Sequence, residues 1–235
     1  MPKAPLIRRI RNKSRDVRHN LSARLRGTEH YEKEWSAKEY DRFYWESVNH
    51  PHRDLLLSRV SEYSPASVLE IGCSSGPNLL RIARAFPSAK LRGIDINRQS
   101  IDIGKKMFAE TGIGNVELDV GKADDLGAFG DRSFDVVLTD AVLIYIGKDK
   151  IDAVAKEMMR IARKAIIMVE YHDPGAGGEG SFIMKKGYWA RDYSALFKPL
   201  NGVADVKLTK ITREIWDDDY WSSYGHVVEV RLKDA

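Results

Sequence analysis

The amino-acid sequence predicts an α/β protein with a doubly wound, mostly parallel sheet, on the strength of three observations. Residues 68–80, VLEIGCSSGPNLL, have the pattern of a buried strand, a glycine loop and an amphipathic helix. Residues 91–97 contain a second short strand, which ends in Asp95, 19 residues after Gly76. Residues 134–139 form a continuous apolar run, which is typical of a central parallel strand buried on both faces.

The loop of residues 72–76 can bring backbone close to a ligand. Glycine at positions 72 and 76 allows a sharp turn without a Cβ in the way. Pro77 suits the first position of a helix, whose free amides can face a polar ligand group. Glu70 lies in a strand that otherwise reads as core, and buried carboxylates rarely lack a partner. We expect Glu70 to orient a loop amide or to meet a cationic ligand group; a plain strand-to-helix turn is the alternative.

Asp95 points to the kind of ligand. An acid about 20 residues after a glycine loop, at the tip of the next strand, binds a ribose diol in doubly wound folds. The loop reads Gly72-Cys-Ser-Ser-Gly76 and lacks the G-x-G-x-x-G pattern of a dinucleotide site. The sequence therefore favours a nucleoside without a pyrophosphate.

These residues resemble the class I S-adenosylmethionine-dependent methyltransferases. The first motif of that family, acid-x-Gly-x-Gly-x-Gly, is matched by Glu70, Gly72 and Gly76, with Ser74 in place of the middle glycine. The resemblance continues through Asp95 and covers residues 50 to 170, including VELDVGKADDL (116–126) and SFDVVLTDAVLIYI (133–146). It implies a Rossmann-like sheet of seven strands with an antiparallel last strand, preceded by an N-terminal helical extension.

The resemblance also implies the cofactor, S-adenosylmethionine, with S-adenosylhomocysteine as its product. Many relatives have an acid facing the adenine amino group where this chain has Lys122, so that contact is expected from the Ala123 backbone or from Asp124. The expected cofactor-binding residues are Glu70, Gly72, Cys73, Ser74, Gly76, Asp95, Ile96, Ala123, Asp124 and Thr139.

The remaining elements follow in order from periodicity and turn residues. We expect helices over 77–86, 100–112, 149–163 and 188–198, and strands over 116–120, 165–169, 205–212 and 226–232. The last two strands resemble the closing antiparallel hairpin of the family. Residues 174–180 hold four glycines and are expected to form a mobile loop that acts as a lid.

Composition limits the class of protein. A chain of 235 residues suits one α/β domain with an appendage. Its single cysteine, Cys73, excludes an internal disulfide and a cysteine-based zinc site, and we interpret it as a packing residue. His50 and His52 lack a further ligand cluster, so no metal is expected. No apolar run approaches the roughly 18 residues of a membrane span and no signal peptide is recognisable, so we expect a cytoplasmic protein.

The chain divides into three parts. Residues 1–27 form a basic amphipathic arm, since residues 1–26 hold nine Lys or Arg against one acid, within a net charge of +4. The arm has three open interpretations: packing on the domain or on a second copy in a homodimer, peripheral binding to an anionic membrane, or contact with nucleic-acid phosphates. It also resembles a mitochondrial transit peptide. Residues 28–64 are expected to be helices that cover the acceptor site, and residues 65–235 the catalytic domain.

The sequence predicts methyl transfer to a small-molecule acceptor, such as a sugar, a lipid or a specialised metabolite. Candidate catalytic residues that contact the acceptor are Tyr145, His172 and His50. Residues 139–142, Thr-Asp-Ala-Val, lack the Asn/Asp-Pro-Pro-aromatic motif of amino-directed nucleic-acid methyltransferases. The alternatives are an RNA methyltransferase that uses the basic arm and a non-catalytic binding subunit with the same fold.

Overall fold

The computed structural model describes residues 28–34, 43–177, 180–183 and 187–233, and its centre is a seven-stranded sheet with the order β3-β2-β1-β4-β5-β9-β8. Strands β1 to β5 run parallel, and β9 runs antiparallel to both β5 and β8. This confirms the predicted doubly wound sheet with an antiparallel last strand. The strands are β1 Ser67–Ile71, β2 Lys90–Asp95, β3 Val116–Val120, β4 Phe134–Asp140, β5 Ala162–Tyr171, β8 Val203–Lys210 and β9 Gly225–Leu232.

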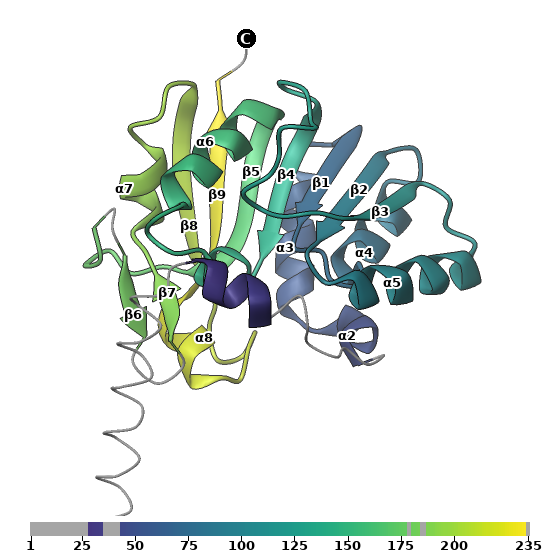
Figure 1. Ribbon diagram of the computed structural model, residues 1–235, viewed down its shortest axis with the longest axis horizontal. Coiled ribbons are helices and arrows are strands. Elements are labelled where there is room, and N and C mark those ends of the chain that lie inside the picture. The colour runs from purple at the N-terminus through teal and green to yellow at the C-terminus, as the bar shows by residue number, and fades with distance from the viewer. Residues whose placement is uncertain (1–27, 35–42, 178–179, 184–186, 234–235) are drawn as a thin grey trace, which may run out of the picture.

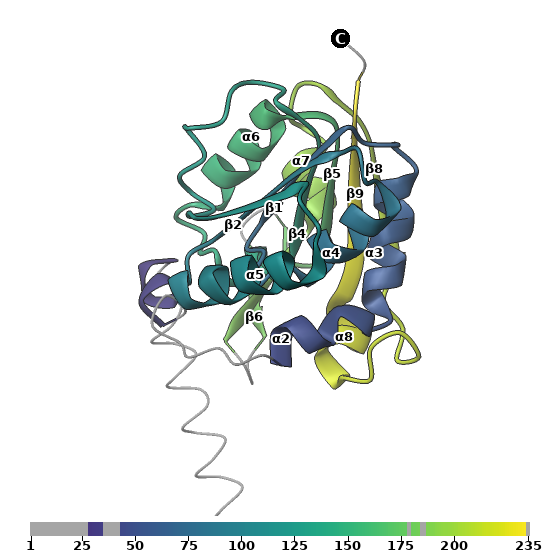
Figure 2. The ribbon, with the colours of Figure 1, turned by 90° about the vertical axis from the view of Figure 1, so that its right-hand side faces the viewer.

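Helices cover both faces of the sheet (Figures 1 and 2). On one face lie α3 (His52–Ser61), α4 (Pro77–Ala85) and α5 (Arg98–Thr111), and on the other α6 (Ile151–Ile161) and α7 (Tyr193–Phe197). A short helix at 28–34, coloured purple in Figure 1, lies beyond one end of the sheet. The shorter helices are α2 (Phe43–Glu46), η1 (Ser47–Asn49), η2 (Leu143–Tyr145) and α8 (Asp219–Tyr224).

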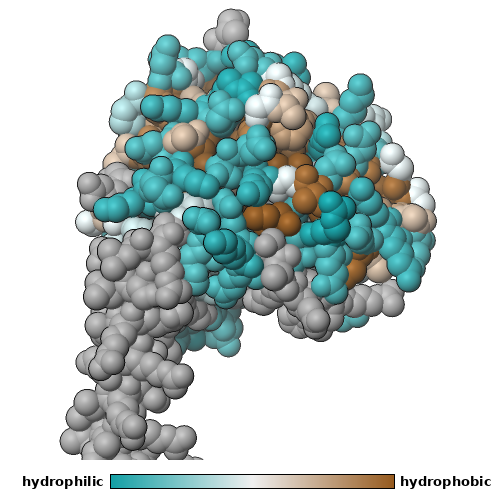
Figure 3. All heavy atoms as spheres, in the orientation of Figure 1, coloured by the Kyte–Doolittle hydropathy of each residue, from teal (hydrophilic) through white to brown (hydrophobic). Residues whose placement is uncertain are grey.

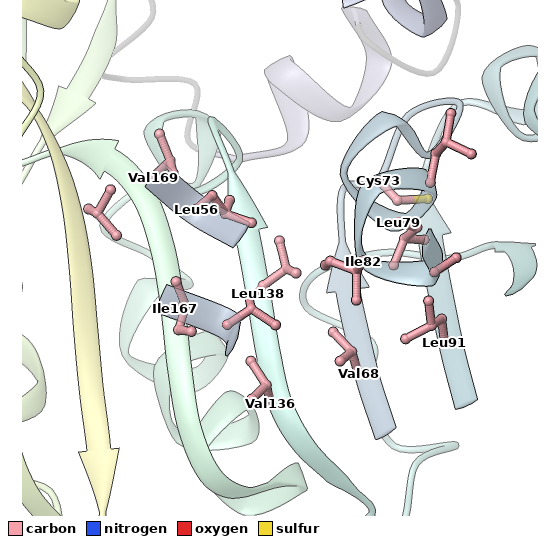
Figure 4. Close-up of a cluster of buried hydrophobic side chains, with 14 of the residues drawn as sticks. Leu56, Val68, Cys73, Leu79, Ile82, Leu91, Val136, Leu138, Ile167 and Val169 are labelled. Atoms are coloured by element: carbon pink, nitrogen blue, oxygen red, sulfur yellow. The ribbon is translucent and has the colours of Figure 1, made fainter. Parts of the chain in front are cut away.

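The strands bury alternate side chains in two core layers, because successive residues of a strand point to opposite faces. Figure 4 shows the layer under α3 and α4, with Leu56, Leu79 and Ile82 against Val68, Val136 and Leu138 of the sheet. The second layer holds Leu69, Val137 and Ile166 from β1, β4 and β5, packed against α6 and α7. Central strands that are apolar on both faces explain the continuous apolar run noted in β4.

The segment after β5 differs from the expectation. A helix predicted over 188–198 is wrong at its start, because Tyr188–Ala190 is strand β7, paired antiparallel with β6 (Ser181–Ile183). Aromatic residues such as Trp189 favour strands. The helix begins only after Asp192, whose side chain accepts a hydrogen bond from Ala195 N at 3.0 Å. The lid expected at 174–180 includes two residues outside the described part and stays a prediction.

The surface in the view of Figure 1 is hydrophilic over most of its area, with hydrophobic residues gathered near its centre (Figure 3). Among the described residues, the exposed large hydrophobic side chains are those of Tyr44, Val120 and Leu208. None of the helices in the described ranges combines the length and the hydrophobicity that a membrane crossing requires. The basic arm expected at residues 1–27, with its proposed membrane, dimer and nucleic-acid contacts, lies outside these ranges.

Candidate cofactor and acceptor site

A cavity lies at the carboxyl ends of β1, β2 and β4, where open α/β sheets bind ligands. The cavity is lined by residues of the loops after these strands and after β3, by residues of the helix at 28–34 and by Tyr44 of α2. The lining residues are Thr28, Tyr31, Glu32, Tyr44, Ile71, Gly72, Ser74, Asp95, Ile96, Asn97, Gly121, Lys122, Ala123, Asp124, Asp140, Ala141, Val142, Tyr145 and Ile146.

Glycine is required at two points of the loop after β1. Gly72 has φ +71°, and a Cβ there would overlap Val142 Cγ2 far inside van der Waals contact. Gly76 has φ +87°, and a Cβ there would lie 2.8 Å from Phe108 Cε2. Both conformations are in the left-handed region that favours glycine. The loop after β1 can therefore pack against the loop after β4 and against α5 only without side chains at these positions.

Asp95 joins the loop after β1 to the end of β2. Its Oδ2 accepts a hydrogen bond from Ser74 N at 2.8 Å, and its Oδ1 accepts one from Asn97 N at 2.8 Å. Burial raises the pKa of Asp95, and the two amide donors limit that rise. Each carboxylate oxygen has a further lone pair, so Asp95 can accept hydrogen bonds from two ligand hydroxyl groups as well.

Two buried carboxylates meet at Asn78 on α4. The Asn78 side-chain amide donates to Glu70 Oε1 at 2.7 Å and to Asp140 Oδ2 at 3.0 Å. Burial raises the pKa of Glu70 to about 8. Burial opposes ionisation of Asp140 as well, but His52, Arg53 and Asn78 hold its pKa well below the usual range.

The other oxygens of this pair, Glu70 Oε2 and Asp140 Oδ1, are buried and have no hydrogen-bond partner among the described residues. Buried carboxylate oxygens without partners are costly, so a cationic ligand group would stabilise them. The ammonium of the methionine part of S-adenosylmethionine is such a group. The site therefore fits this cofactor through Asp140, which lines the cavity and has a buried oxygen without a partner.

His52 and Arg53 hold Asp140 from α3. His52 Nε2 lies 2.9 Å from Asp140 Oδ2, and Arg53 Nη1 donates to the same oxygen at 3.0 Å. The other ring nitrogen of His52, Nδ1, lies 2.6 Å from His50 Nδ1. Trp216 stacks on His52 with ring centroids 4.3 Å apart. This network links His50 to the cavity wall.

Glu170 at the end of β5 shapes the loop that carries Tyr145. Its carboxylate accepts hydrogen bonds from the backbone amides of residues 142, 143 and 144, at 3.0, 3.0 and 3.1 Å. It also accepts one from Thr139 Oγ1 at 2.8 Å. Burial raises its pKa to about 7 in spite of these donors. The buried Glu170 side chain thus fixes η2, which presents Tyr145 to the cavity.

The helix at 28–34 is held over the cavity by charge. Glu32 pairs with Lys122 at 3.1 Å and with Lys150 at 3.0 Å, and Lys150 pairs with Asp124 at 2.5 Å. Thr28 Oγ1 accepts a hydrogen bond from Gly147 N at 2.8 Å. Lys122, which replaces the acid of many relatives, therefore binds the N-terminal helix.

The structure brings part of the predicted site to the cavity. Among the predicted cofactor-binding residues, the cavity is lined by Gly72, Ser74, Asp95, Ile96, Ala123 and Asp124. The other four lie behind this wall in the described structure: Glu70, Cys73, Gly76 and Thr139. Cys73 packs under Gly93, and burial raises the pKa of its thiol well above the usual value.

The three candidate catalytic residues are placed differently. Tyr145 lines the cavity, and His50 reaches it through His52 and Asp140. His172 is buried, with its Nδ1 accepting a hydrogen bond from Tyr193 N at 3.3 Å and its ring packed 5.0 Å from that of His226. His172 is outside the set of described residues that line the cavity.

Several site residues were missed because they come from distant segments. Thr28, Tyr31 and Glu32 precede the glycine loop by about 40 residues, and no local motif marks them. His52, Arg53 and Asn78 act through Asp140 rather than on the cavity directly. The sequence does hold one signal for this network: Asn78, directly after Gly76-Pro77, is a polar residue at the start of a helix next to the glycine loop.

Comparisons with known proteins agree with this geometry. A family model described as a methyltransferase domain matches residues 68–165. An uncharacterized protein of Rickettsia prowazekii, RP028, is 29% identical over 109 residues, which is 46% of this chain and 43% of that protein. Mouse catechol O-methyltransferase is 27% identical over 142 residues, which is 59% of this chain and 50% of the enzyme. The chain therefore spans half or less of the length of these curated relatives.

A solved structure of a SAM-dependent methyltransferase from Aquifex aeolicus has the same fold. It superimposes with a TM-score of 0.56 at 12% identity, covering 83% of this chain and all of the other. The described residues contain no group of His, Cys, Asp or Glu side chains that could hold a metal ion. The strand order, the glycine loop, the acid at Asp95 and the family match identify residues 68–165 as the core of a class I S-adenosylmethionine-dependent methyltransferase domain.

Proposed function

We propose that this protein transfers the methyl group of S-adenosylmethionine to a small-molecule acceptor. One observation carries the proposal: the same cavity is lined by Asp95 and Gly72 and by the aromatic side chains of Tyr31, Tyr44 and Tyr145. When bound, the cofactor supplies a methyl group on a positively charged sulfur, which an acceptor attacks in line. The residues of the cavity supply positioning, which accounts for much of the rate in such a transfer.

The site offers a partner for each polar part of S-adenosylmethionine. Asp140, which lines the cavity and has a lowered pKa, suits the ammonium through its unpartnered Oδ1. Asp95 suits the ribose diol. Asp124 is already paired with Lys150, so the Ala123 backbone is the better candidate for the adenine amino group.

Three of the residues that line the cavity are aromatic, namely Tyr31, Tyr44 and Tyr145. Aromatic walls with few polar groups are typical of small-molecule sites. We assign Tyr145 and His50 to the acceptor and leave out His172, whose ring nitrogen is already used by Tyr193 N. In this assignment residues 28–64 cover the acceptor and residues 65–235 form the catalytic domain. Mouse catechol O-methyltransferase, a partial relative, is named for a small hydroxyl-bearing acceptor, which supports this substrate class.

The alternatives make different predictions. An RNA methyltransferase would depend on residues 1–26, and its turnover would fall steeply with salt, because phosphate contacts release counterions. A binding subunit would bind S-adenosylhomocysteine without transferring a methyl group. No feature of the described residues favours either alternative over the small-molecule assignment.

The test is a methyl-transfer assay with labelled S-adenosylmethionine against a panel of small hydroxyl, amine and carbon acids, with total RNA as a second panel. We expect a methylated small molecule, turnover that tolerates high salt, and retention of activity when residues 1–26 are removed. Labelling of RNA alone, lost on removal of residues 1–26, would establish the nucleic-acid function instead. Binding of S-adenosylhomocysteine with no turnover on either panel would indicate a binding subunit.

A further inference from the structure

Glu32 brings a carboxylate to the cavity from a segment far from the glycine loop. It lies on the helix at 28–34 and lines the cavity. Its Oε2 accepts a hydrogen bond from Lys122 Nζ at 3.1 Å, and its Oε1 accepts one from Lys150 Nζ at 3.0 Å. Lys122 belongs to the loop after β3, and Lys150 directly precedes α6. Two lysines on separate segments therefore fix the orientation of one carboxylate in the cavity wall.

The two ion pairs leave the Glu32 carboxylate able to bind a ligand. A carboxylate has about four lone-pair sites on its two oxygens, and each lysine takes a site on a different oxygen. Asp124 also lines the cavity and shares Lys150 with Glu32. Two lysines orient Glu32 before a ligand arrives, whereas Asp124 pairs with one of them. Such prior ordering lowers the cost of binding.

The order of the strands indicates which part of a nucleoside would meet Glu32. The sheet order β3-β2-β1-β4 puts Asp95, at the end of β2, between Asp140 at the end of β4 and Lys122 after β3. With the ammonium at Asp140 and the ribose at Asp95, the base, at the opposite end of the ligand, extends toward the loop after β3. Gly121 N donates to Asp95 O at 3.0 Å, so this loop lies directly beside Asp95. Glu32, bound to Lys122, is therefore next to the base.

A carboxylate distinguishes an amino group from an oxo group on a base. It accepts hydrogen bonds and donates none, so it binds an amino group and repels an oxo group at the same position. The amino group of adenine has two hydrogens and can donate to two acceptors. The Ala123 backbone is the candidate for one of them, since Ala123 lines the cavity on the same loop as Lys122. Glu32 is placed to accept the other.

We infer, on the basis of the proposed cofactor, that Glu32 determines the specificity of the site for adenine. Its carboxylate accepts a hydrogen bond from the exocyclic amino group, beside the contact of the Ala123 backbone. Lys122 and Lys150 are positioning residues, which hold Glu32 against the loop after β3. The site then takes a 6-aminopurine nucleoside and rejects the corresponding 6-oxopurine nucleoside.

Isothermal titration calorimetry of the whole protein tests this inference with two ligands, S-adenosylhomocysteine and S-inosylhomocysteine, whose base carries an oxo group in place of the amino group. We expect the wild type to bind S-adenosylhomocysteine at least about 10-fold more tightly, because the oxo group loses a charged hydrogen bond. Glu32→Gln should lower this preference by about 10-fold, since the glutamine amide accepts from an amino group or donates to an oxo group. Loosening of the helix at 28–34 weakens both ligands alike and leaves the ratio unchanged.

Matched variants separate the contact from a general effect of charge. Glu29→Gln should keep the wild-type preference, because Glu29 pairs with Lys33 on the same helix and lies outside the described cavity lining. Lys122→Gln should lower the preference several-fold, because Glu32 loses one of the two lysines that orient it. Lys105→Gln, an exposed change on α5, should leave the preference unchanged.

The outcomes distinguish this inference from the cofactor assignment on which it rests. An unchanged preference in Glu32→Gln would overturn the inference, and so would a preference lost in Asp124→Asn but kept in Glu32→Gln. Equal binding of the two ligands by the wild type would overturn it as well, while leaving S-adenosylhomocysteine as a ligand of the cavity. Failure of the wild type to bind either ligand would contradict both the inference and the cofactor assignment.

Discussion

Ser74 N donates a hydrogen bond to Asp95 Oδ2 at 2.8 Å, and this contact ties the glycine loop after β1 to the end of β2. The same carboxylate lines the cavity, so one side chain both fixes the loop and faces the ligand. The arrangement places the loop amides and Asp95 in position before the ligand arrives, which lowers the cost of ordering them on binding.

Replacement of Asp95 tests this dual role. We expect Asp95→Ala to weaken S-adenosylhomocysteine binding by about 1–3 kcal/mol, the usual effect of losing a charged hydrogen bond, or about 5- to 150-fold in the dissociation constant. Isothermal titration calorimetry gives the number. Asp119→Ala is the control, because Asp119 pairs with Arg92 on the outer strands of the sheet and lies outside the described cavity lining. An unchanged dissociation constant for Asp95→Ala would refute the ribose assignment.

The buried carboxyl of Glu70 should make stability fall as pH rises. Its pKa is raised from 4.5 to about 8 in the folded protein, so the folded state binds the proton more tightly than the unfolded chain. Its contribution is fully present below pH 4.5 and is lost as pH rises through about 8. The upper limit of the slope is about 1.4 kcal/mol per pH unit for one group.

Urea unfolding at a series of pH values measures this effect. Glu70→Gln should flatten the curve between pH 5 and 8, whereas Glu117→Gln, an exposed change on β3, should leave it as in the wild type. Glu170, with its pKa raised to about 7, contributes a slope of the same sign and remains in both variants. Parallel curves for the wild type and Glu70→Gln would show that Glu70 is ionised in the folded state.

The close approach of two loops at Gly72 predicts a large steric effect. We expect Gly72→Ala to destabilise the fold by more than about 2 kcal/mol, because the new Cβ would meet Val142 in addition to the strain of a positive φ. Gly112→Ala is the matched control, since Gly112 has φ +69° and no atom lies within 4 Å of the position that its new Cβ would take. Thermal unfolding of both variants separates the two contributions. Equal losses would mean that Val142 moves aside at no cost.

The ion pairs of Glu32 should slow the dissociation of the bound ligand from the cavity. We expect Glu32→Gln to raise the dissociation rate of S-adenosylhomocysteine several-fold, because the helix at 28–34 would lose its pairs with Lys122 and Lys150. Salt should raise the rate of the wild type in the same direction, since partly exposed ion pairs are screened. Glu29→Gln on the same helix is the control, because the ion pair of Glu29 lies within that helix, with Lys33. Stopped-flow displacement measures the rates. Release from the wild type at a rate independent of salt would contradict a role of these ion pairs in retaining the cofactor.

Sequence reasoning succeeded where the information is local. The glycine loop, the strand ending at Asp95 and the apolar runs of β1 and β4 are each encoded within about ten residues, and the sheet order confirms the strands. It failed at Tyr188, where pairing with β6 overrode the expected helix. Strand pairing depends on a partner segment, which the periodicity of residues 188–198 does not include.

The polar network of the site could not be predicted from local sequence patterns, because its partners are far apart in the sequence. His52 meets Asp140 across 88 positions of sequence, and Thr28 meets Gly147 across 119. His50 could be named as a candidate from its residue type alone. Its contact with His52, and through His52 with Asp140, is formed only in the folded chain.

The most direct test of the central claim is a calorimetric titration of the purified protein with S-adenosylmethionine, S-adenosylhomocysteine and NAD. We predict binding of the first two at one site, because Asp140 lines the cavity with an unpartnered oxygen for the ammonium and Asp95 lines it for the ribose. We predict no binding of NAD, since the loop after β1 lacks the pyrophosphate pattern. Failure of both sulfur ligands to bind, or binding of NAD alone, would contradict the assignment of this cavity to S-adenosylmethionine.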